Sequence, residues 1–188
     1  MKNEYLILVN RKHPICDEPD DLVSVSYAYP EIKLRWAAQT SLTNLLDAIG
    51  CADQIIPISG YRTQQEQIEI YESSLLENGL VFTKKYVALP GCSEHQTGLA
   101  IDLALNQGNI DFICPDFPYD GICGEFRKQA PKYGFIERYP KGKEAITSIA
   151  HEPWHFRYVG CPHAEIITTM NLTLEEYIYD RENQKCNI

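Results

Sequence analysis

At 188 residues, the chain is long enough to bury a hydrophobic core and short enough to form a single domain over residues 1–188. Its formal net charge is −9 and its lysines and arginines form no cluster, which argues against nucleic acid or an anionic membrane as a partner. The apolar run from Tyr5 to Val9 is too short for a signal peptide or a membrane span, so we expect a cytoplasmic protein.

The seven cysteines are odd in number and include no C-x-x-C pair. In a reducing cytoplasm such residues are more often small buried side chains than disulfides. We therefore expect free thiols.

The first third of the chain predicts two strands and a helix. Residues 4–10 and 22–29 have strand composition, and the Pro/Asp-rich segment between them is typical of a loop. Apolar residues recur at helical spacing over residues 31–49, and Gly50 follows them at the position of a C-capping glycine.

The middle of the chain predicts a strand, a helix and a second strand. Residues 54–61 have strand composition, and Thr63 to Glu66 form a capping box that opens a helix, which Gly79 is expected to end. Residues 98–105 then alternate with a period of two. On one face of this predicted strand, Asp102 has only alanines, Ala100 and Ala104, as neighbours.

The last third predicts a helix over residues 122–132, strands at 134–139 and 155–160, and a C-terminal helix opened by a capping box at Thr173. The connections are too irregular for successive βαβ units. The expected fold class is therefore α+β, with a mostly antiparallel sheet and flanking helices.

The segment HEPWH, residues 151–155, has the letters of the zincin signature H-E-x-x-H, in which two histidines one helical turn apart bind zinc. Pro153 opposes that geometry, because proline inside a helix costs about 3 kcal/mol and moves the preceding residue out of the helical region. The following residues are also strand-like. What remains is a glutamate, Glu152, and a histidine, His155, in an extended or turning segment.

The segment SEHQTGLAID supplies the other candidate ligands. His95 lies in a polar turn, and Asp102 is flanked by small side chains on an otherwise apolar strand, where a buried carboxylate requires a cation or strong donors. With His155 they make a three-ligand N/O set, the number that catalytic zinc sites use when one position stays open for water.

Two further residues complete this hypothesis. Glu152 can take a proton from a water whose pKa the metal lowers, and Arg62, at a strand-to-helix junction, can stabilise the developing oxyanion. Taken singly, each residue also fits a structural role: His95 in a surface turn, Asp102 paired with an arginine, Arg62 as a solvated charge. The hypothesis depends on their combination.

A structural zinc site made of cysteine and histidine is an alternative. Cys92 lies three residues before His95, and Cys161 lies two residues before His163. Such a site needs four ligands closed around the ion, and it would leave Glu152 without a role. Cys92 is therefore expected to be a packed thiol beside the site.

Three motifs together resemble a known family. GYRT at 60–63, S-x-H-x-x-G-x-A-x-D at 93–102 and E-x-W-H at 152–155 occur in the order and approximate spacing of the zinc D-alanyl-D-alanine peptidases of the VanY type. The longer stretch from Phe82 to Asp102, with EPWHFRYVG, looks most like the VanXY bifunctional dipeptidase/carboxypeptidases. The resemblance covers about residues 5 to 180.

The resemblance implies the Hedgehog/D,D-peptidase fold and one Zn²⁺ per chain. It implies that His95, Asp102 and His155 are the zinc ligands. It implies Glu152 as the general base and Arg62 as the stabiliser of the substrate carbonyl. The implied substrate contacts are Ser93, Gln67 and Trp154. His151 has no place in the family pattern and is expected to lie outside the ligand set.

The resemblance also implies the reaction. The expected substrates are small peptides: the D-Ala-D-Ala dipeptide and the cytoplasmic muramyl pentapeptide that ends in it, whose hydrolysis confers resistance to glycopeptides such as vancomycin. Two alternatives stay open. One is a peptidoglycan endopeptidase of the same fold, and the other is an inactive module that binds metal or peptide.

Overall fold

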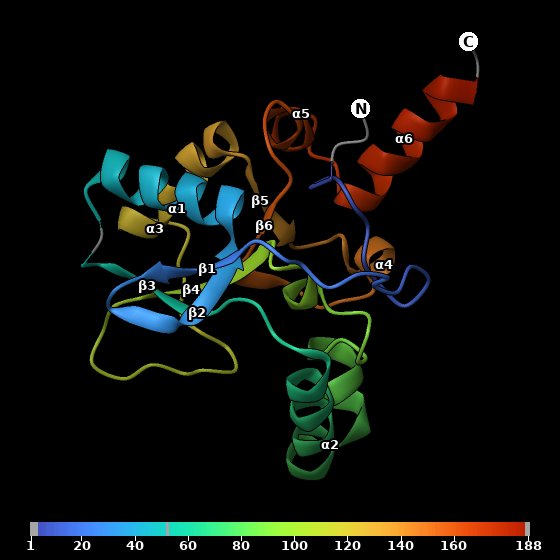
Figure 1. The fold of residues 1–188 in the computed structure, drawn as a ribbon, viewed down its shortest axis with the longest axis horizontal. Coiled ribbons are helices and arrows are strands. Elements are labelled where there is room, and N and C mark those ends of the chain that lie inside the picture. The colour runs from blue at the N-terminus through green and yellow to red at the C-terminus, as the bar shows by residue number, and fades with distance from the viewer. Residues whose placement is uncertain (1–3, 52, 187–188) are drawn as a thin grey trace.

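A four-stranded antiparallel sheet in the order β3-β4-β6-β5 forms the centre of the computed structural model, which describes residues 4–51 and 53–186 (Figure 1). Its strands are β3 (Ile55–Ser59), β4 (Ala100–Leu105), β5 (Phe135–Tyr139) and β6 (Glu152–Tyr158). A separate hairpin of β1 (Leu22–Ser26) and β2 (Tyr29–Arg35) lies beside β3. The expected α+β class with an antiparallel sheet is confirmed.

The main core lies between the sheet and two helices, α1 (Trp36–Ile49) and α3 (Gly121–Gln129). Burying each large apolar side chain there contributes roughly 1.5–3 kcal/mol. The sheet and helix residues that meet in this core include Ala38, Leu42, Leu45, Ile101, Leu103, Cys123, Phe126, Phe135 and Phe156.

A second, smaller core holds the C-terminal part of the chain. Here α5 (His163–Thr169) and α6 (Leu174–Cys186) pack against the end of the sheet through Ile136 of β5. The predicted capping box is present, because the Thr173 hydroxyl accepts from the Glu176 amide while the Glu176 carboxylate accepts from the Thr173 amide.

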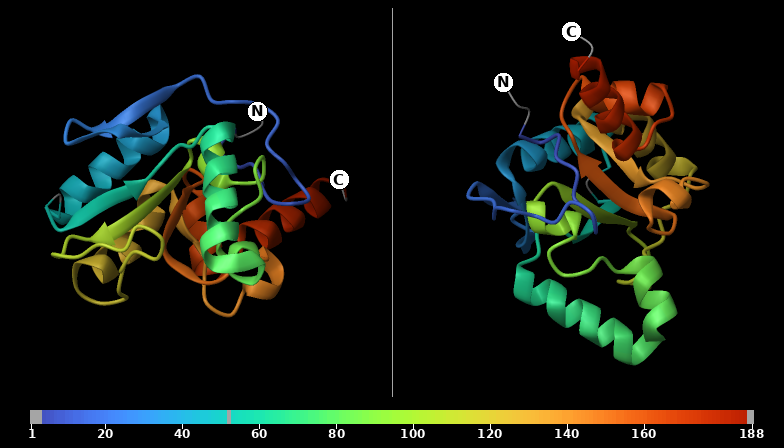
Figure 2. Two further views of the ribbon diagram at one scale, coloured as in Figure 1. Left: turned by 90° about the horizontal axis from the view of Figure 1, so that it is seen from below. Right: turned by 90° about the vertical axis from the view of Figure 1, so that its right-hand side faces the viewer.

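The helix α2 (Gln64–Tyr86) extends away from the sheet and turns back on itself (Figures 1 and 2). Its predicted capping box, Thr63 with Glu66, is formed. The prediction that Gly79 ends the helix is only half correct. Gly79 has φ 78° and breaks the helix there, but the chain resumes helical geometry and continues to Tyr86.

Two predictions at the N-terminal end are wrong. Residues 4–10 form no strand and make only a bridge between Asn10 and His13, because the carbonyls of Tyr5 and Ile7 accept hydrogen bonds from Arg157 instead of from a neighbouring strand. Residues 31–35 belong to β2, since they pair with β1 and place Leu34 in the core, and α1 begins only at Trp36.

The remaining elements differ from the predictions mainly at their ends. The predicted helix 122–132 is α3 followed by a 3₁₀ turn, η2 (Ala130–Tyr133), which begins next to Pro131. β6 begins three residues earlier than expected, at Glu152. The polar turn predicted at His95 is the 3₁₀ turn η1 (Glu94–Thr97). The short helices α4 (Glu144–Thr147) and α5 were not predicted. Within residues 4–51 and 53–186, no helix has the length and apolarity needed to cross a membrane.

Candidate metal centre

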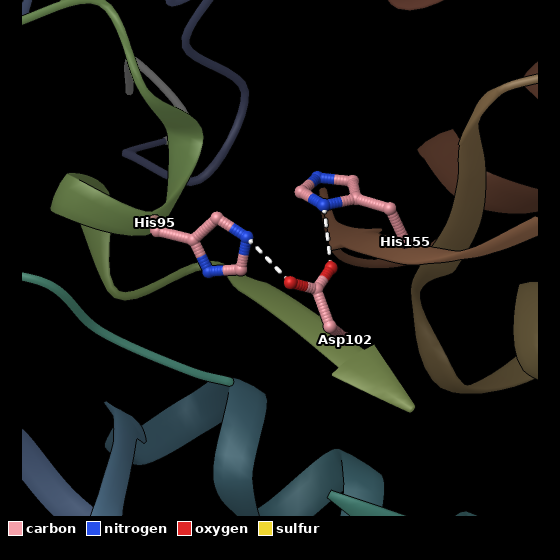
Figure 3. A group of neighbouring side chains, drawn as sticks. All are labelled: His95, Asp102 and His155. Carbon is pink, nitrogen blue, oxygen red and sulfur yellow. Dashed lines mark hydrogen bonds and ion pairs between the residues drawn. The ribbon is translucent and has the colours of Figure 1, made fainter. Parts of the chain in front are cut away.

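Three buried side chains converge where β4 and β6 pair (Figure 3). Asp102 of β4 is the direct cross-strand neighbour of His155 of β6, and His95 reaches them from η1. One ligand atom from each of the three residues lies within 4.8 Å of the others. The structure therefore brings together the three residues that the sequence nominated as metal ligands.

Strand alternation explains the place of Asp102. Its neighbours Ile101 and Leu103 face the main core, so Asp102 points to the opposite side of β4. On β3, one extra residue separates the pairs Pro57–Leu103 and Ser59–Asp102, which is the mark of a β-bulge. The bulge brings the end of β3, and with it Arg62, to the side of Asp102.

A second irregularity explains how Glu152 and His155 share one site. Regular alternation would place residues three apart on opposite faces of a strand. Between β5 and β6, however, the register shifts between the pairs Glu137–Phe156 and Tyr139–Glu152. These pairs are two residues apart on β5 but four residues apart on β6, so β6 is bulged there. Pro153 lies in this bulged segment, where its missing N–H costs no ladder hydrogen bond. Glu152 Oε2 consequently comes within 4.0 Å of His155 Nδ1.

The orientation of the His95 ring favours a cation beside it. Nδ1 lies 2.7 Å from the Gly60 carbonyl, an acceptor, so Nδ1 carries the hydrogen and donates it. Burial and Arg62 lower the pKa of His95, which keeps the ring neutral. The lone pair of Nε2 then faces Asp102 Oδ2 at 3.1 Å. Arg62 Nη2 lies 3.2 Å from the same oxygen, and a cation bound between Nε2 and Oδ2 would offset the repulsion between these two electron-rich atoms.

His155 faces the same carboxylate from the other side, with Nδ1 2.8 Å from Asp102 Oδ1. Burial alone would lower the pKa of His155, but the hydrogen bond with Asp102 and the nearby Glu94 carboxylate raise it to about 9. Burial would likewise raise the pKa of Asp102, but the two imidazoles hold it well below its usual range. The carboxylate thus stays ionised and concentrates negative charge between the two rings.

This donor set fits a zinc ion. Two imidazole nitrogens and one carboxylate oxygen are the ligand types of catalytic zinc sites, which have three protein ligands and one open position. The Gly60 carbonyl fixes the His95 ring with Nε2 toward the centre, as the outer hydrogen bonds of metal-binding histidines usually do. Within the described parts of the chain, this is the single such convergence of histidine, cysteine and acidic side chains.

Glu152 lies beside the ligands without being one of the three. Burial raises its pKa to about 8, while His155 lowers it and Asp102 raises it further. In the metal-free protein the carboxyl group therefore holds a proton at neutral pH. A bound cation would favour the ionised form, which is the form that can accept a proton from water.

Arg62 is held at the rim of this group. Its Nε and Nη2 donate to the Ser59 hydroxyl at 3.0 and 2.8 Å, and Nη2 also lies 3.2 Å from Asp102 Oδ2. The forked guanidinium is thereby fixed in direction and retains Nη1 for another acceptor.

The three predicted substrate contacts lie in different surroundings. Ser93 is buried at the start of η1, two residues before His95. Gln67 is fully buried on α2, where its Nε2 donates to the Ala88 carbonyl while its Oε1 finds no hydrogen-bond partner among the described residues. Trp154 belongs to the main core. Their contact with substrate stays a prediction.

The cysteine–histidine alternative finds no geometric support in the described residues. His163 Nδ1 is hydrogen-bonded to the Tyr177 hydroxyl, and Cys161 Sγ donates to the Lys132 carbonyl. Cys92 is partly buried and does not belong to the converging group. His151 also lies outside that group and contacts the Tyr119 hydroxyl at 2.7 Å. The six cysteines whose side chains are described are all free.

Sequence reasoning missed several groups that build the site. The Ser59 hydroxyl and the Gly60 carbonyl position Arg62 and His95, and the Tyr139 ring packs on His155 with 4.9 Å between ring centroids. Glu94, next to His95, was quoted in a motif but given no role. The spacing of these residues in the sequence gives no sign of their roles. Contacts made by a backbone carbonyl, or produced by a β-bulge, do not depend on a recognisable pattern of residue types.

The chain is similar in sequence to known peptidases. Residues 31–161 match the VanY family, described as D-alanyl-D-alanine carboxypeptidase. The chain belongs to this family. The bifunctional D-Ala-D-Ala dipeptidase and D-Ala-D-Ala carboxypeptidase VanXYC of Enterococcus gallinarum is 47% identical to it over 175 residues, which cover 92% of each protein.

Solved structures of VanY-family proteins agree with this assignment. The vancomycin-resistance D,D-dipeptidase VanXYg, in complex with a D-Ala-D-Ala phosphinate analogue, has a TM-score of 0.92 and 52% identity, covering 93% of this chain and 70% of that one. The D,D-pentapeptidase VanY of a VanB-type resistance cassette, in complex with Zn(II), has a TM-score of 0.74 and 33% identity, covering 93% and 98%. The resemblance inferred from the three motifs, and the fold it implied, are confirmed.

Proposed function

We propose that this VanY-family chain is a zinc-dependent D,D-peptidase. It hydrolyses the D-Ala-D-Ala dipeptide, removes the terminal D-alanine of muramyl pentapeptide precursors and thereby confers glycopeptide resistance. The observation that carries the proposal is the buried convergence of His95, Asp102 and His155 with Glu152 beside it. The substrate follows from the relatives, since VanXYC and VanXYg are both named as D,D-dipeptidases.

Each of these side chains has a defined role in the reaction. A bound zinc ion would polarise the scissile carbonyl and lower the pKa of water. Glu152 takes a proton from the attacking water and delivers it to the leaving amine, so that the amide C–N bond breaks after the new C–O bond has formed. Arg62 donates N–H groups to the carbonyl oxygen as negative charge develops on it.

The buried amide of Gln67 supports a place for the substrate. Its unpaired Oε1 is an acceptor, and a buried acceptor without a donor costs about 1–3 kcal/mol. An N–H group of the substrate would satisfy it. We propose Gln67, with Ser93 and Trp154, as the substrate contacts, and one zinc ion per chain held by His95, Asp102 and His155.

The test is a comparison of three substrates with the purified protein. We expect about one zinc per chain and release of D-alanine from D-Ala-D-Ala and from the pentapeptide, with D-Ala-D-Ser measured alongside. Glu152→Ala should keep the metal and lose turnover. A wild-type protein that carries zinc but releases no D-alanine from either dipeptide or pentapeptide would contradict the proposal.

The two rival functions are decided in the same assay. An endopeptidase would release fragments from a cross-linked muropeptide or cut an L,D-linked substrate while leaving D-Ala-D-Ala intact. An inactive module would bind zinc or peptide and turn over none of these substrates. Action on precursors in the cytoplasm stays a prediction, to be tested by fractionating cells that express the protein.

A further inference from the structure

Two buried polar atoms without hydrogen-bond partners face each other on the far side of His155. They are His155 Nε2 and Glu94 Oε2, and they lie 3.6 Å apart, slightly beyond hydrogen-bond length. The His155 side chain is 4% exposed and that of Glu94 is 0% exposed, so neither atom is open to bulk solvent. A buried pair of this kind requires an explanation, because each unsatisfied atom destabilises the fold.

Glu94 is held rigidly from its other side. Its Oε1 accepts from Arg138 Nε at 2.7 Å and lies 2.8 Å from Arg157 Nη1, and both arginines are fully buried. Arg138 is itself fixed by two parallel hydrogen bonds, at 2.9 and 2.6 Å, to Glu175 of α6. The two guanidinium groups thus keep the Glu94 carboxylate ionised and direct its second oxygen at His155.

The two histidines of the converging group consequently direct different ring nitrogens at its centre. His95 gives its Nδ1–H to the Gly60 carbonyl and directs Nε2 at the centre. His155 directs Nδ1 at the centre, beside Asp102, and leaves Nε2 toward Glu94. Each ring has an outer acceptor that fixes its direction, a carbonyl in one case and a carboxylate in the other.

We propose that Glu94 is a positioning residue of the metal centre: it accepts the Nε2–H of His155 and so fixes the ring with Nδ1 as the metal-binding atom. The inference rests on the zinc site proposed above. Carboxylates that accept from metal-binding histidines orient the ring and strengthen its basicity. Arg138 and Arg157 position this carboxylate in turn.

The first test is the ring form of the two histidines in the zinc-loaded wild-type protein, read by long-range ¹H–¹⁵N NMR of ¹⁵N-histidine-labelled enzyme. We expect His95 to carry its hydrogen on Nδ1 and His155 on Nε2, with the His155 N–H signal protected from exchange with water. A His155 ring that carries its hydrogen on Nδ1, or an Nε2–H that exchanges as freely as an exposed imidazole, would overturn the proposal.

The second test is zinc affinity, measured by competition with a chelating dye. Glu94→Asp keeps the charge between the arginines but withdraws the carboxylate from His155, and we expect zinc to bind about 10–100-fold more weakly. Glu125→Asp is the matched control, because it makes the same substitution at a glutamate of α3 that pairs with Lys128 and Gln129 and has no part in the Arg138–Glu94–His155 arrangement. It should leave zinc affinity unchanged.

The outcomes separate this inference from the proposed function. A wild-type protein that binds no zinc would contradict the proposed function itself. A wild-type protein that binds zinc, together with a Glu94→Asp variant that binds it equally tightly, would contradict only the role of Glu94. If Glu94→Asp fails to fold, as circular dichroism would reveal, the NMR measurement on the wild type decides alone.

Discussion

The carboxylate of Asp102 contacts two imidazoles and a guanidinium at once, with distances of 2.8 Å to His155, 3.1 Å to His95 and 3.2 Å to Arg62. All four side chains are largely buried, so these charges interact more strongly than they would at the surface. The effect of any one residue of the site therefore depends on its neighbours, and single substitutions must be read with matched controls.

Arg62→Lys should lower turnover while leaving zinc content unchanged. Lysine keeps the positive charge but not the forked donors that Ser59 fixes in direction. Loss of one well-placed donor to a developing oxyanion costs about 100-fold in kcat. Arg11→Lys is the control, since Arg11 is exposed and donates to the Lys84 carbonyl. Equal kcat for wild type and Arg62→Lys would contradict the role of Arg62.

The metal-free protein should lose stability through Glu152 as pH rises. Burial raises the pKa of Glu152 to about 8 from an ordinary value of 4.5, so the folded state holds a proton that the unfolded state releases first. This contribution is complete below pH 4.5 and is lost as pH rises through about 8. Glu152→Gln lacks it, because its amide does not titrate.

Urea unfolding of chelator-treated protein tests this expectation. The free energy of unfolding of the wild type, relative to that of Glu152→Gln, should fall between about pH 5 and pH 8. The other titrating groups are common to both proteins. A difference that stays constant over this range would show that Glu152 is not buried as a neutral carboxyl.

Among the elements, the junction between β3 and α2 approaches the backbone of β2 closely at Gly60. A Cβ on Gly60 would lie 2.3 Å from the Lys33 carbonyl oxygen of β2, a distance that real Cβ atoms do not adopt. The Gly60 carbonyl is also the acceptor for His95 Nδ1. The hairpin of β1 and β2 thus sets how closely the segment carrying Arg62 can approach the metal centre.

Gly60→Ala should therefore weaken both folding and zinc binding. We expect a loss of about 1–3 kcal/mol in the free energy of unfolding, as for other overpacked positions, together with lower zinc affinity because the His95 acceptor moves. Gly108→Ala is the control, because a Cβ there meets nothing within 4 Å. Thermal unfolding measures the change in stability, and dye competition measures the change in zinc affinity. A Gly60→Ala protein with unchanged stability and zinc affinity would contradict the close approach of Gly60 to Lys33.

Sequence patterns recovered the elements whose signal is local. The period-two strand that contains Asp102, the capping boxes at Thr63 and Thr173 and the glycine after α1 all appear as predicted. Their signals are local, because hydrogen-bonding side chains and glycine conformations act within a few residues. The strand β2 was mistaken for helix, since apolar spacing cannot tell a short strand from a helix when its partner strand is unknown.

The metal centre was nominated from residue types and motif order, but its geometry was not foreseeable. Both β-bulges depend on pairing between distant strands, and the bulge at Pro153 alone allows Glu152 and His155 to share one side. The prediction that Pro153 excludes a helix in this segment is correct. Pro153 did not reveal the register of β6 against β5, because that register depends on how the two strands pair in the sheet.

At the scale of the whole molecule, Arg157 joins the N-terminal segment to the centre of the sheet. It is fully buried, and its guanidinium donates to the carbonyls of Tyr5 and Ile7 while also facing Glu94. Segments 150 residues apart in sequence thus share one side chain. The N-terminal segment forms no strand, yet it satisfies a buried charge.

Deletion of residues 1–9 should destabilise the protein. Arg157 would lose two acceptors in a buried setting, and the cost of an unsatisfied charged donor is about 2–3 kcal/mol. Deletion of residues 1–3 alone leaves both carbonyls in place and is the control. Chemical unfolding of the two truncated proteins gives the comparison, and equal stability would show that water replaces the lost acceptors.

The long sequence separations within the metal centre also bear on the order of folding. His155 lies 53 residues from Asp102, and His95 lies 35 residues from Gly60. His95 and Asp102 lie in one short segment, but His155 comes from a distant strand, so the full group of three exists only once β4 and β6 have paired. An ion that binds only the completed group would stabilise the native state, and we expect it to slow unfolding without hastening folding.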